Sequence, residues 1–136
     1  MCIRDRYKDF VDYSVRNGWS VENNCHRIYS GYELETDKPI VISTWQSLYR
    51  LGMKFFDGYE LVIGDEAHGF KARSLISIMT KLVNARYRIG TTGTLDGTQT
   101  HQLVLEGLFG AVHQVTTTKK LMDRDCLLYT SPSPRD

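Results

Sequence analysis

Two stretches of this chain are continuously apolar and do not alternate with polar residues. Residues 40–44 read Ile-Val-Ile-Ser-Thr, and residues 61–64 read Leu-Val-Ile-Gly. Such β-branched, apolar runs are typical of strands that are buried on both faces, whereas a half-exposed strand alternates. A sheet of such strands needs helices on each side. The two runs therefore favour an α/β fold, with a mostly parallel sheet and helices on both faces.

Strand and helix patterns alternate along the rest of the chain, and residues 73–84 have the clearest amphipathic helical spacing. This order is typical of a doubly wound sheet. The other predicted helices are 7–16, 45–52, 101–109 and 117–122, and the other predicted strands are 25–29, 87–91 and 112–116.

Composition excludes several classes of protein. The chain has 136 residues, which is too few for two full domains. Its 17 Lys and Arg residues nearly balance 16 Asp and Glu residues. This balance argues against a basic arm or an acidic tail but does not exclude a local nucleic-acid-binding patch. The three cysteines lack zinc or redox spacing. Because no membrane-spanning run or secretory signal occurs, we expect a cytoplasmic protein without a membrane partner.

Both ends of the chain resemble translated adapter DNA. Residues 1–6 (Met-Cys-Ile-Arg-Asp-Arg) and 126–131 (Cys-Leu-Leu-Tyr-Thr-Ser) can be back-translated into strings that are reverse complements of each other, apart from their ends. Two natural termini have no reason to be encoded by opposite strands of one element. The alternative is a natural Ser/Pro tail. We expect residues 7–125 to be native, and residues 1–6 and 126–136 to derive from a sequencing-library adapter.

Polar clusters follow three of the predicted strands. They are residues 44–47 (Thr-Trp-Gln-Ser), 65–68 (Asp-Glu-Ala-His) and 91–94 (Thr-Thr-Gly-Thr). Ligands of parallel α/β sheets bind at the carboxyl ends of the strands, so we expect these clusters to form one site.

Asp65 and Glu66 are the most specific feature of these clusters. Adjacent side chains on an extended chain point to opposite sides, so the two carboxylates are expected to have different roles. One could hold a hard cation such as Mg²⁺, and the other could orient or deprotonate an attacking water. The alternative is that Asp65 caps the next turn and Glu66 is merely solvated.

These clusters resemble the motifs of one family. Residues 65–68, placed after the strand 61–64, resemble the Walker B box (motif II) of superfamily-two helicases of the DEAD/DEAH-box class. Residues 92–94 resemble motif III, with Thr-Gly-Thr in place of Ser-Ala-Thr, and residues 42–48 resemble the Ile-x-Thr-x-Gln segment. The stretches 108–110 and 115–117 continue like the phage UvsW-like branch of these helicases, so the resemblance spans 7–125.

The resemblance implies a RecA-like P-loop NTPase domain that uses ATP and Mg²⁺. Asp65 would contact Mg²⁺ through water, and Glu66 would position and activate the water that attacks the γ-phosphate. His68 would link the nucleotide site to motif III and to the second motor domain. In motif III, the hydroxyls of Thr92 and Thr94 would couple hydrolysis to strand movement, and Gly93 would supply the turn.

The resemblance also places Thr44, Trp45 and Gln46 towards the nucleic acid. Gln46 is the best candidate for a backbone contact. Trp45 begins an apolar helical face, which favours a place in the core over a base-stacking role.

Two parts of such a motor do not occur in the sequence. Phosphoryl transfer in P-loop enzymes needs a Gly-rich loop with a lysine, and no G-x-x-x-x-G-K-[ST] pattern is present. The second motor domain, with its arginine finger, is also absent. We therefore expect a fragment of the first motor domain of an ATP-dependent DNA helicase, inactive alone. Its parent would act on branched DNA or recombination intermediates, in the cytoplasm of an infected bacterium if a phage encodes it.

Two alternatives stay open. The chain could be a Mg²⁺-dependent phosphodiester hydrolase built on Asp65 and Glu66, with Asp96 as a further carboxylate. It could also be a non-enzymatic nucleic-acid-binding module that kept the fold and lost the phosphate loop. Truncation predicts, in addition, an exposed apolar flank and poor solubility of residues 7–125.

Overall fold

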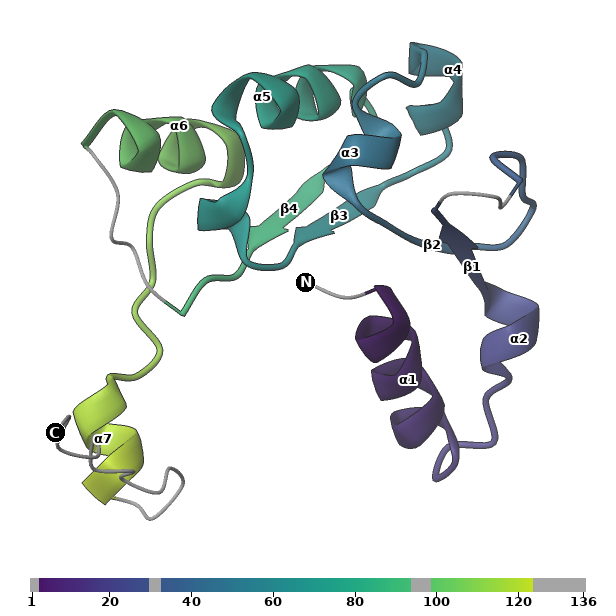
Figure 1. Cartoon of the computed structure of the whole chain (residues 1–136), viewed down its shortest axis with the longest axis horizontal. Coiled ribbons are helices and arrows are strands. Elements are labelled where there is room, and N and C mark those ends of the chain that lie inside the picture. Colours follow the sequence, from purple (N-terminus) through teal and green to yellow (C-terminus); the bar gives the residue numbers. More distant parts are fainter. Residues whose placement is uncertain (1–2, 30–32, 94–98, 124–136) are drawn as a thin grey trace, which may run out of the picture.

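The computed structural model of this chain describes residues 3–29, 33–93 and 99–123 (Figure 1). Its strands form two parallel pairs. Strand β1 (Cys25–Ile28) pairs with β2 (Ile40–Ser43), and β3 (Leu61–Gly64) pairs with β4 (Tyr87–Gly90). The predicted parallel α/β architecture is thus confirmed as two small sheets rather than as one continuous sheet. Two-stranded sheets are marginal alone, so each pair depends on its own helices.

Helices α1 (Ile3–Ser14) and α2 (Val21–Asn24) pack against the first strand pair. Their buried cluster consists of Ile3, Val21, Cys25 and Ile42. The Arg27 guanidinium lies 4.2 Å from the centre of the Tyr7 ring, which ties α1 to β1 by a cation–π contact. Burial raises the pKa of the Cys25 thiol. Helix α1 begins before the predicted 7–16, and the adapter origin of residues 1–6 and 126–136 stays a prediction.

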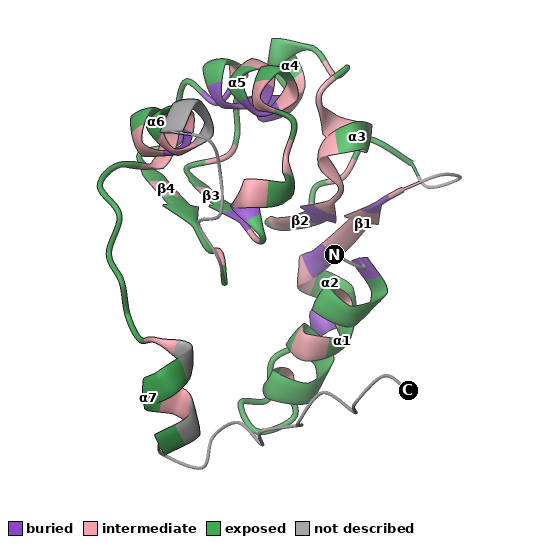
Figure 2. Ribbon diagram, turned by 60° about the vertical axis from the view of Figure 1, so that its left-hand side comes forward, coloured by how far each residue is buried: buried purple, intermediate pink, exposed green. Residues whose placement is uncertain are grey.

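The main core lies between the second strand pair and four helices, which Figure 2 shows above β3 and β4. These helices are α3 (Trp45–Leu48), α4 (Met53–Phe56), α5 (Ala72–Lys81) and α6 (Gln99–Phe109). Two basic side chains hold helix ends in place. Lys81 Nζ donates to the carbonyls of Tyr49 and Leu51 at 2.8 and 2.7 Å, and the Arg88 guanidinium donates to the Leu82 carbonyl at 2.9 Å. Cations are favourable at the carboxyl ends of helices. The buried residues of this core are Phe56, Ala67, Leu75, Ile78, Met79, Leu82, Ala85 and Leu105.

The opposite face of β3 and β4 is open among the residues that the structure describes. The register pairs Leu61 with Tyr87 and Ile63 with Ile89, so these four side chains share one face. They are 49%, 65%, 60% and 48% exposed, respectively. The prediction of helices on both faces is therefore wrong for this pair. Val62 and the glycines Gly64 and Gly90 face the helices, and burial of the other face would need a further element of structure.

Two glycines let α6 approach the sheet closely. A Cβ atom added at Gly64 would lie 3.0 Å from the Phe109 ring, and one added at Gly90 would lie 3.1 Å from it. The ring of Phe109 thus rests on the last residues of both strands. Helix α6 then ends at Gly110, whose φ of 98° is in the left-handed region that favours glycine.

We expect Gly90→Val to lower the free energy of unfolding by about 2–3 kcal/mol, because the added carbons overpack the space that the Phe109 ring fills. Urea denaturation of dilute protein measures this change. Gly58→Val is the matched control, since nothing lies within 4 Å of a Cβ added there, and it should cost about 0.5 kcal/mol or less. Equal losses for the two variants would contradict the packing role.

The prediction of a last strand at residues 112–116 is wrong. These residues are exposed and form no strand ladder, and Val115 is 95% exposed. Their β-branched side chains favour an extended chain, but none of the four described strands pairs with them. The short helix after them is present as α7 (Thr118–Asp123), which Figure 1 shows well away from β3 and β4. Among the described helices, none is long and apolar enough to cross a membrane.

Candidate active site

The polar clusters after β3 and β4 lie side by side. The backbone NH of Thr91 donates to the Gly64 carbonyl at 2.9 Å, and the NH of Ala67 donates to the Thr91 carbonyl at 2.9 Å. These bonds continue the parallel register past the ends of both strands. They fix the segment 65–68 against the segment 91–93, as expected for a site at the carboxyl edge of a sheet.

The two carboxylate oxygens of Asp65 have different surroundings. Oδ1 accepts a hydrogen bond from the Thr91 hydroxyl at 2.9 Å. Oδ2 is buried and accepts no hydrogen bond from the described residues, although Arg6 Nε lies 3.1 Å away as an ion-pair partner. The Asp65 side chain as a whole is 28% exposed. The Arg6 cation offsets part of the cost of burying this oxygen, and a hydrated metal ion in its place would do the same.

Glu66 leaves the strand in a left-handed conformation. Its φ and ψ are 51° and 47°, and it is the one non-glycine residue with a positive φ in the described ranges. The expectation that Asp65 and Glu66 point apart because the chain is extended is therefore wrong, since the chain turns at Glu66. Their environments still differ, because the Glu66 side chain is 53% exposed and lies beside His68 instead of Thr91. Strained backbone of this kind is concentrated at functional sites.

His68 connects the two clusters directly. Its Nδ1 atom is hydrogen-bonded to the Thr92 hydroxyl, and it lies 3.3 Å from Glu66 Oε2. The contact spans 24 positions of sequence. Gly93 follows in the same exposed turn, while Thr94 and Asp96 lie outside the described residues.

The cluster after β2 lies on a different element. Thr44 precedes α3, and its hydroxyl is 3.1 Å from that of Ser47. Trp45 is half-buried, packs on the main core and contacts the Tyr49 ring with centroids 6.2 Å apart. Gln46 is exposed. Trp45 thus has a core contact, whereas the side chain of Gln46 is accessible to a partner.

Sequence reasoning missed Thr91 as a partner of Asp65. The signal was present, because both strands end with the same Ile-Gly pair, and aligning these pairs sets Asp65 opposite Thr91. It also missed Arg6, which belongs to the segment attributed to an adapter.

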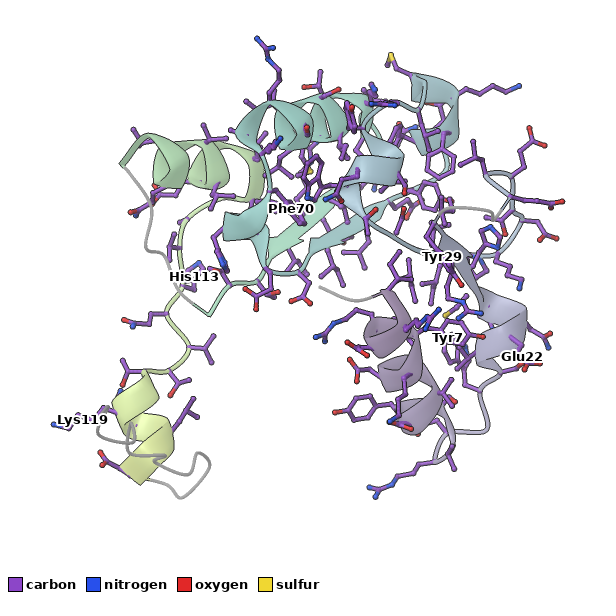
Figure 3. All side chains as sticks on the ribbon, viewed as in Figure 1. Tyr7, Glu22, Tyr29, Phe70, His113 and Lys119 are labelled. Carbon is purple, nitrogen blue, oxygen red and sulfur yellow. The ribbon has the colours of Figure 1, made fainter. Side chains whose placement is uncertain are left out.

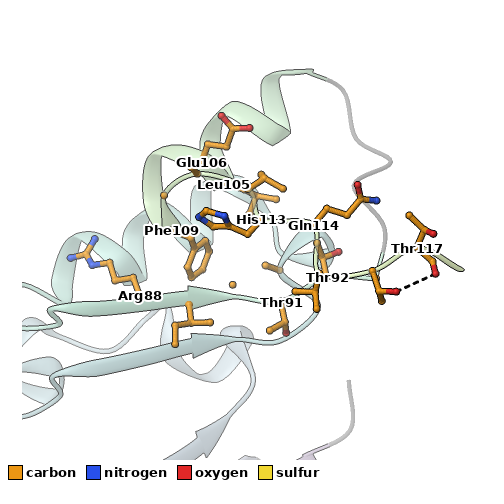
Figure 4. A pocket seen from close by; sticks show the side chains of 18 of the residues that line it. Arg88, Thr91, Thr92, Leu105, Glu106, Phe109, His113, Gln114 and Thr117 are labelled. Atoms are coloured by element: carbon orange, nitrogen blue, oxygen red, sulfur yellow. Dashed lines mark hydrogen bonds between the residues drawn. The ribbon is translucent and has the colours of Figure 1, made fainter. Parts of the chain in front are cut away.

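A groove of about 790 Å³ borders this site on the side of β4. Figure 4 shows Thr91, Thr92 and Phe109 on its wall, with His113 and Gln114 on the facing segment. Its lining residues come from β4 and the turn after it, from α6 and from residues 110–117. Figure 3 shows His113 pointing towards the body of the protein.

The residues present suit a single cation held through water. No group of three or more His, Cys, Asp or Glu side chains that could hold a metal occurs within residues 3–29, 33–93 and 99–123. Mg²⁺ needs fewer protein ligands than that, because it keeps several waters and accepts one or two carboxylates. The buried Oδ2 of Asp65 would be one such oxygen, in place of its present pairing with Arg6 at 3.1 Å.

Comparison with known proteins gives consistent matches. The family model described as type III restriction enzyme, res subunit, matches residues 3–97. The ATP-dependent DNA helicase UvsW of Enterobacteria phage T4 is 27% identical over 115 residues, which cover 85% of this chain and 23% of the phage protein. The crystal structure of the phage T4 UvsW helicase superposes with a TM-score of 0.67 at 29% identity, covering 79% of this chain and 38% of that one. These matches confirm the family resemblance predicted from the sequence, and the chain spans about a quarter of its curated relative.

Proposed function

Because this chain belongs to the family described as type III restriction enzyme, res subunit, we propose that it is part of the first motor domain of an ATP-dependent DNA helicase. The observation that carries the proposal is the bonded junction between the ends of β3 and β4. There Asp65 meets Thr91, and His68 meets Thr92. A motor needs such a connection, because ATP hydrolysis at motif II must change the conformation of motif III.

Each residue of the junction has a proposed task. Asp65 would hold Mg²⁺ through water, and Glu66 would orient the attacking water and accept its proton. Mg²⁺, when bound with ATP, would neutralise the charge that develops on the phosphate oxygens. The exposed carboxylate of Glu66 can reach an incoming water, whereas the partly buried Asp65 is held by Thr91.

His68 and motif III would transmit the state of the nucleotide. A movement of the Glu66 carboxylate would displace the His68 ring, whose Nδ1 lies 3.3 Å from Glu66 Oε2. The same Nδ1 is hydrogen-bonded to the Thr92 hydroxyl, so the movement would reach motif III. Thr94 is proposed as the second coupling hydroxyl and Gly93 as the pivot of the turn. We propose that the segment of Thr44, Trp45 and Gln46 lies on the DNA side of the domain. The exposed Gln46 would contact the DNA backbone, and Trp45 would anchor the segment to the main core.

The parent chain would supply the remaining parts. They are a phosphate loop, which positions the β- and γ-phosphates, and a second motor domain with an arginine finger. The curated relative is named an ATP-dependent DNA helicase, which supports DNA as the partner of the parent. Branched DNA is the proposed substrate. The fragment alone is proposed to be inactive, because Asp65 and Glu66 cannot orient a triphosphate without that loop.

Recovery of the parent gene tests the proposal. Sequencing across both ends of the source locus should reveal a Gly-rich loop ending in Gly-Lys-Ser/Thr upstream of residue 7. The encoded protein should then show DNA-stimulated ATP hydrolysis and separate branched DNA strands. If no loop exists and the chain cleaves phosphodiester bonds in a metal-dependent manner, the hydrolase alternative replaces this proposal. DNA binding without either activity would favour the binding module.

A further inference from the structure

Thr91 contacts the proposed metal-site carboxylate although it lies outside the residues that resemble motif III. Its hydroxyl donates to Asp65 Oδ1 at 2.9 Å. It is also the residue through which β4 is bonded to the end of β3, once by its NH and once by its carbonyl, each at 2.9 Å. Three hydrogen bonds therefore fix Thr91 relative to Asp65.

The hydrogen bond from the Thr91 hydroxyl gives the two oxygens of the Asp65 carboxylate different roles. With Oδ1 engaged, rotation of the Asp65 side chain is restricted. Oδ2 is buried and accepts no hydrogen bond from the described residues, and its ion-pair partner is Arg6, whose Nε lies 3.1 Å away. Partners that hold a ligating group in one orientation spare the ion the cost of ordering it. Valine has nearly the shape of threonine but no hydroxyl, so Thr91→Val would free the carboxylate to rotate.

We infer that Thr91 is a positioning residue for the metal-binding carboxylate: its hydroxyl orients Asp65 so that Oδ2 is presented to the hydrated cation. This inference rests on the proposed function, because Asp65 acquires a cation only in a nucleotide-binding motor. It adds a residue that acts through Asp65 and contacts neither phosphate nor DNA itself.

The test measures how much Mg²⁺ tightens nucleotide binding to the parent helicase. The probe is mant-ADP, titrated by fluorescence in excess Mg²⁺ and again in EDTA. The variants, numbered as in this chain, are Thr91→Val, Thr91→Ser and Asp65→Asn. Thr80→Val is the matched control, because it also removes a threonine hydroxyl that donates a hydrogen bond. That hydroxyl bonds at 2.7 Å to the Ile76 carbonyl within α5 and does not contact Asp65.

In Thr91→Val, the Mg²⁺-dependent gain in affinity should fall by about 10-fold, which is the usual scale for loss of a residue that orients a metal ligand. Affinity in EDTA should not change, and this distinguishes lost orientation from damaged folding. Thr91→Ser, which keeps the hydroxyl, and Thr80→Val should retain the full gain.

The outcomes distinguish failure of the positioning role of Thr91 from failure of the proposed function. If Asp65→Asn loses the gain while Thr91→Val keeps it, the positioning role is overturned and the proposed function stands. If Asp65→Asn keeps the gain, or if the parent binds no mant-ADP, the proposed function fails and the inference fails with it. If Thr91→Val loses affinity equally in EDTA and in Mg²⁺, Thr91 is merely structural and the inference is wrong.

Discussion

Glu66→Gln should reduce the turnover of ATP by the parent helicase by about 10²–10⁴-fold, the usual contribution of a general base. Glutamine keeps the size of the side chain and the left-handed turn at this position, but it cannot accept the proton of the attacking water. Binding of ATP should change little, because the phosphates are held elsewhere. Steady-state hydrolysis with saturating DNA, together with equilibrium nucleotide binding, measures the two quantities.

Glu60→Gln provides the matched control for this experiment. Glu60 is an exposed acid just before β3, at the opposite end of the same strand, and only its backbone carbonyl joins the ladder to Tyr87. Its variant should hydrolyse ATP at the rate of the unaltered protein. Full activity of Glu66→Gln would remove Glu66 from the mechanism, and equal damage by both variants would indicate a general effect of lost charge.

The isolated chain should self-associate through the open face of β3 and β4. Leu61, Ile63, Tyr87 and Ile89 form an apolar patch there, each at least 48% exposed. Burial of such area stabilises by about 25 cal/mol per Å², so a second molecule gains by covering it. Sedimentation velocity across a range of concentrations should show a monomer that gives way to larger species as the concentration rises.

Two substitutions on the patch should reverse this association. Ile63→Thr with Ile89→Thr keeps the β-branched shape that suits a strand but makes the face more polar, and it should raise the monomeric fraction several-fold. Ile76→Thr with Val83→Thr is the matched control, because these residues are 43% and 57% exposed but lie outside the patch. A concentration-independent monomer of the unaltered chain would contradict the prediction.

Local patterns were enough to predict most of the elements. The apolar runs at 40–44 and 61–64 correspond to β2 and β3. The amphipathic stretch 73–84 corresponds to α5, which begins one residue earlier, at Ala72, and ends three residues earlier, at Lys81. The hydrophobic pattern gave wrong predictions where strand formation or burial depends on a partner that is distant in sequence. Residues 112–116 have the composition of a strand, and the second face of β3 has the composition of a buried face. Within the part of the chain that the structure describes, the former have no ladder partner and the latter has no covering element.

The candidate site was predictable to the level of its clusters but not of its contacts. The meeting of His68 with Thr92 follows from two motifs at the ends of adjacent strands. The left-handed backbone of Glu66 does not follow from local sequence, because glutamate has no preference for it. It occurs together with the tertiary hydrogen bond from the Ala67 NH to the Thr91 carbonyl, immediately after β3.

The left-handed turn at Glu66 also determines how this position would evolve in the laboratory. A non-glycine residue in that region costs roughly 1 kcal/mol, and glycine or asparagine adopts it with less strain. Variants selected only for heat resistance would therefore drift towards Gly or Asn at position 66 and discard the carboxylate. Under the proposed function, selection for turnover would restore glutamate. The proposed role of Glu66 and its backbone conformation thus place opposite demands on the residue at this position.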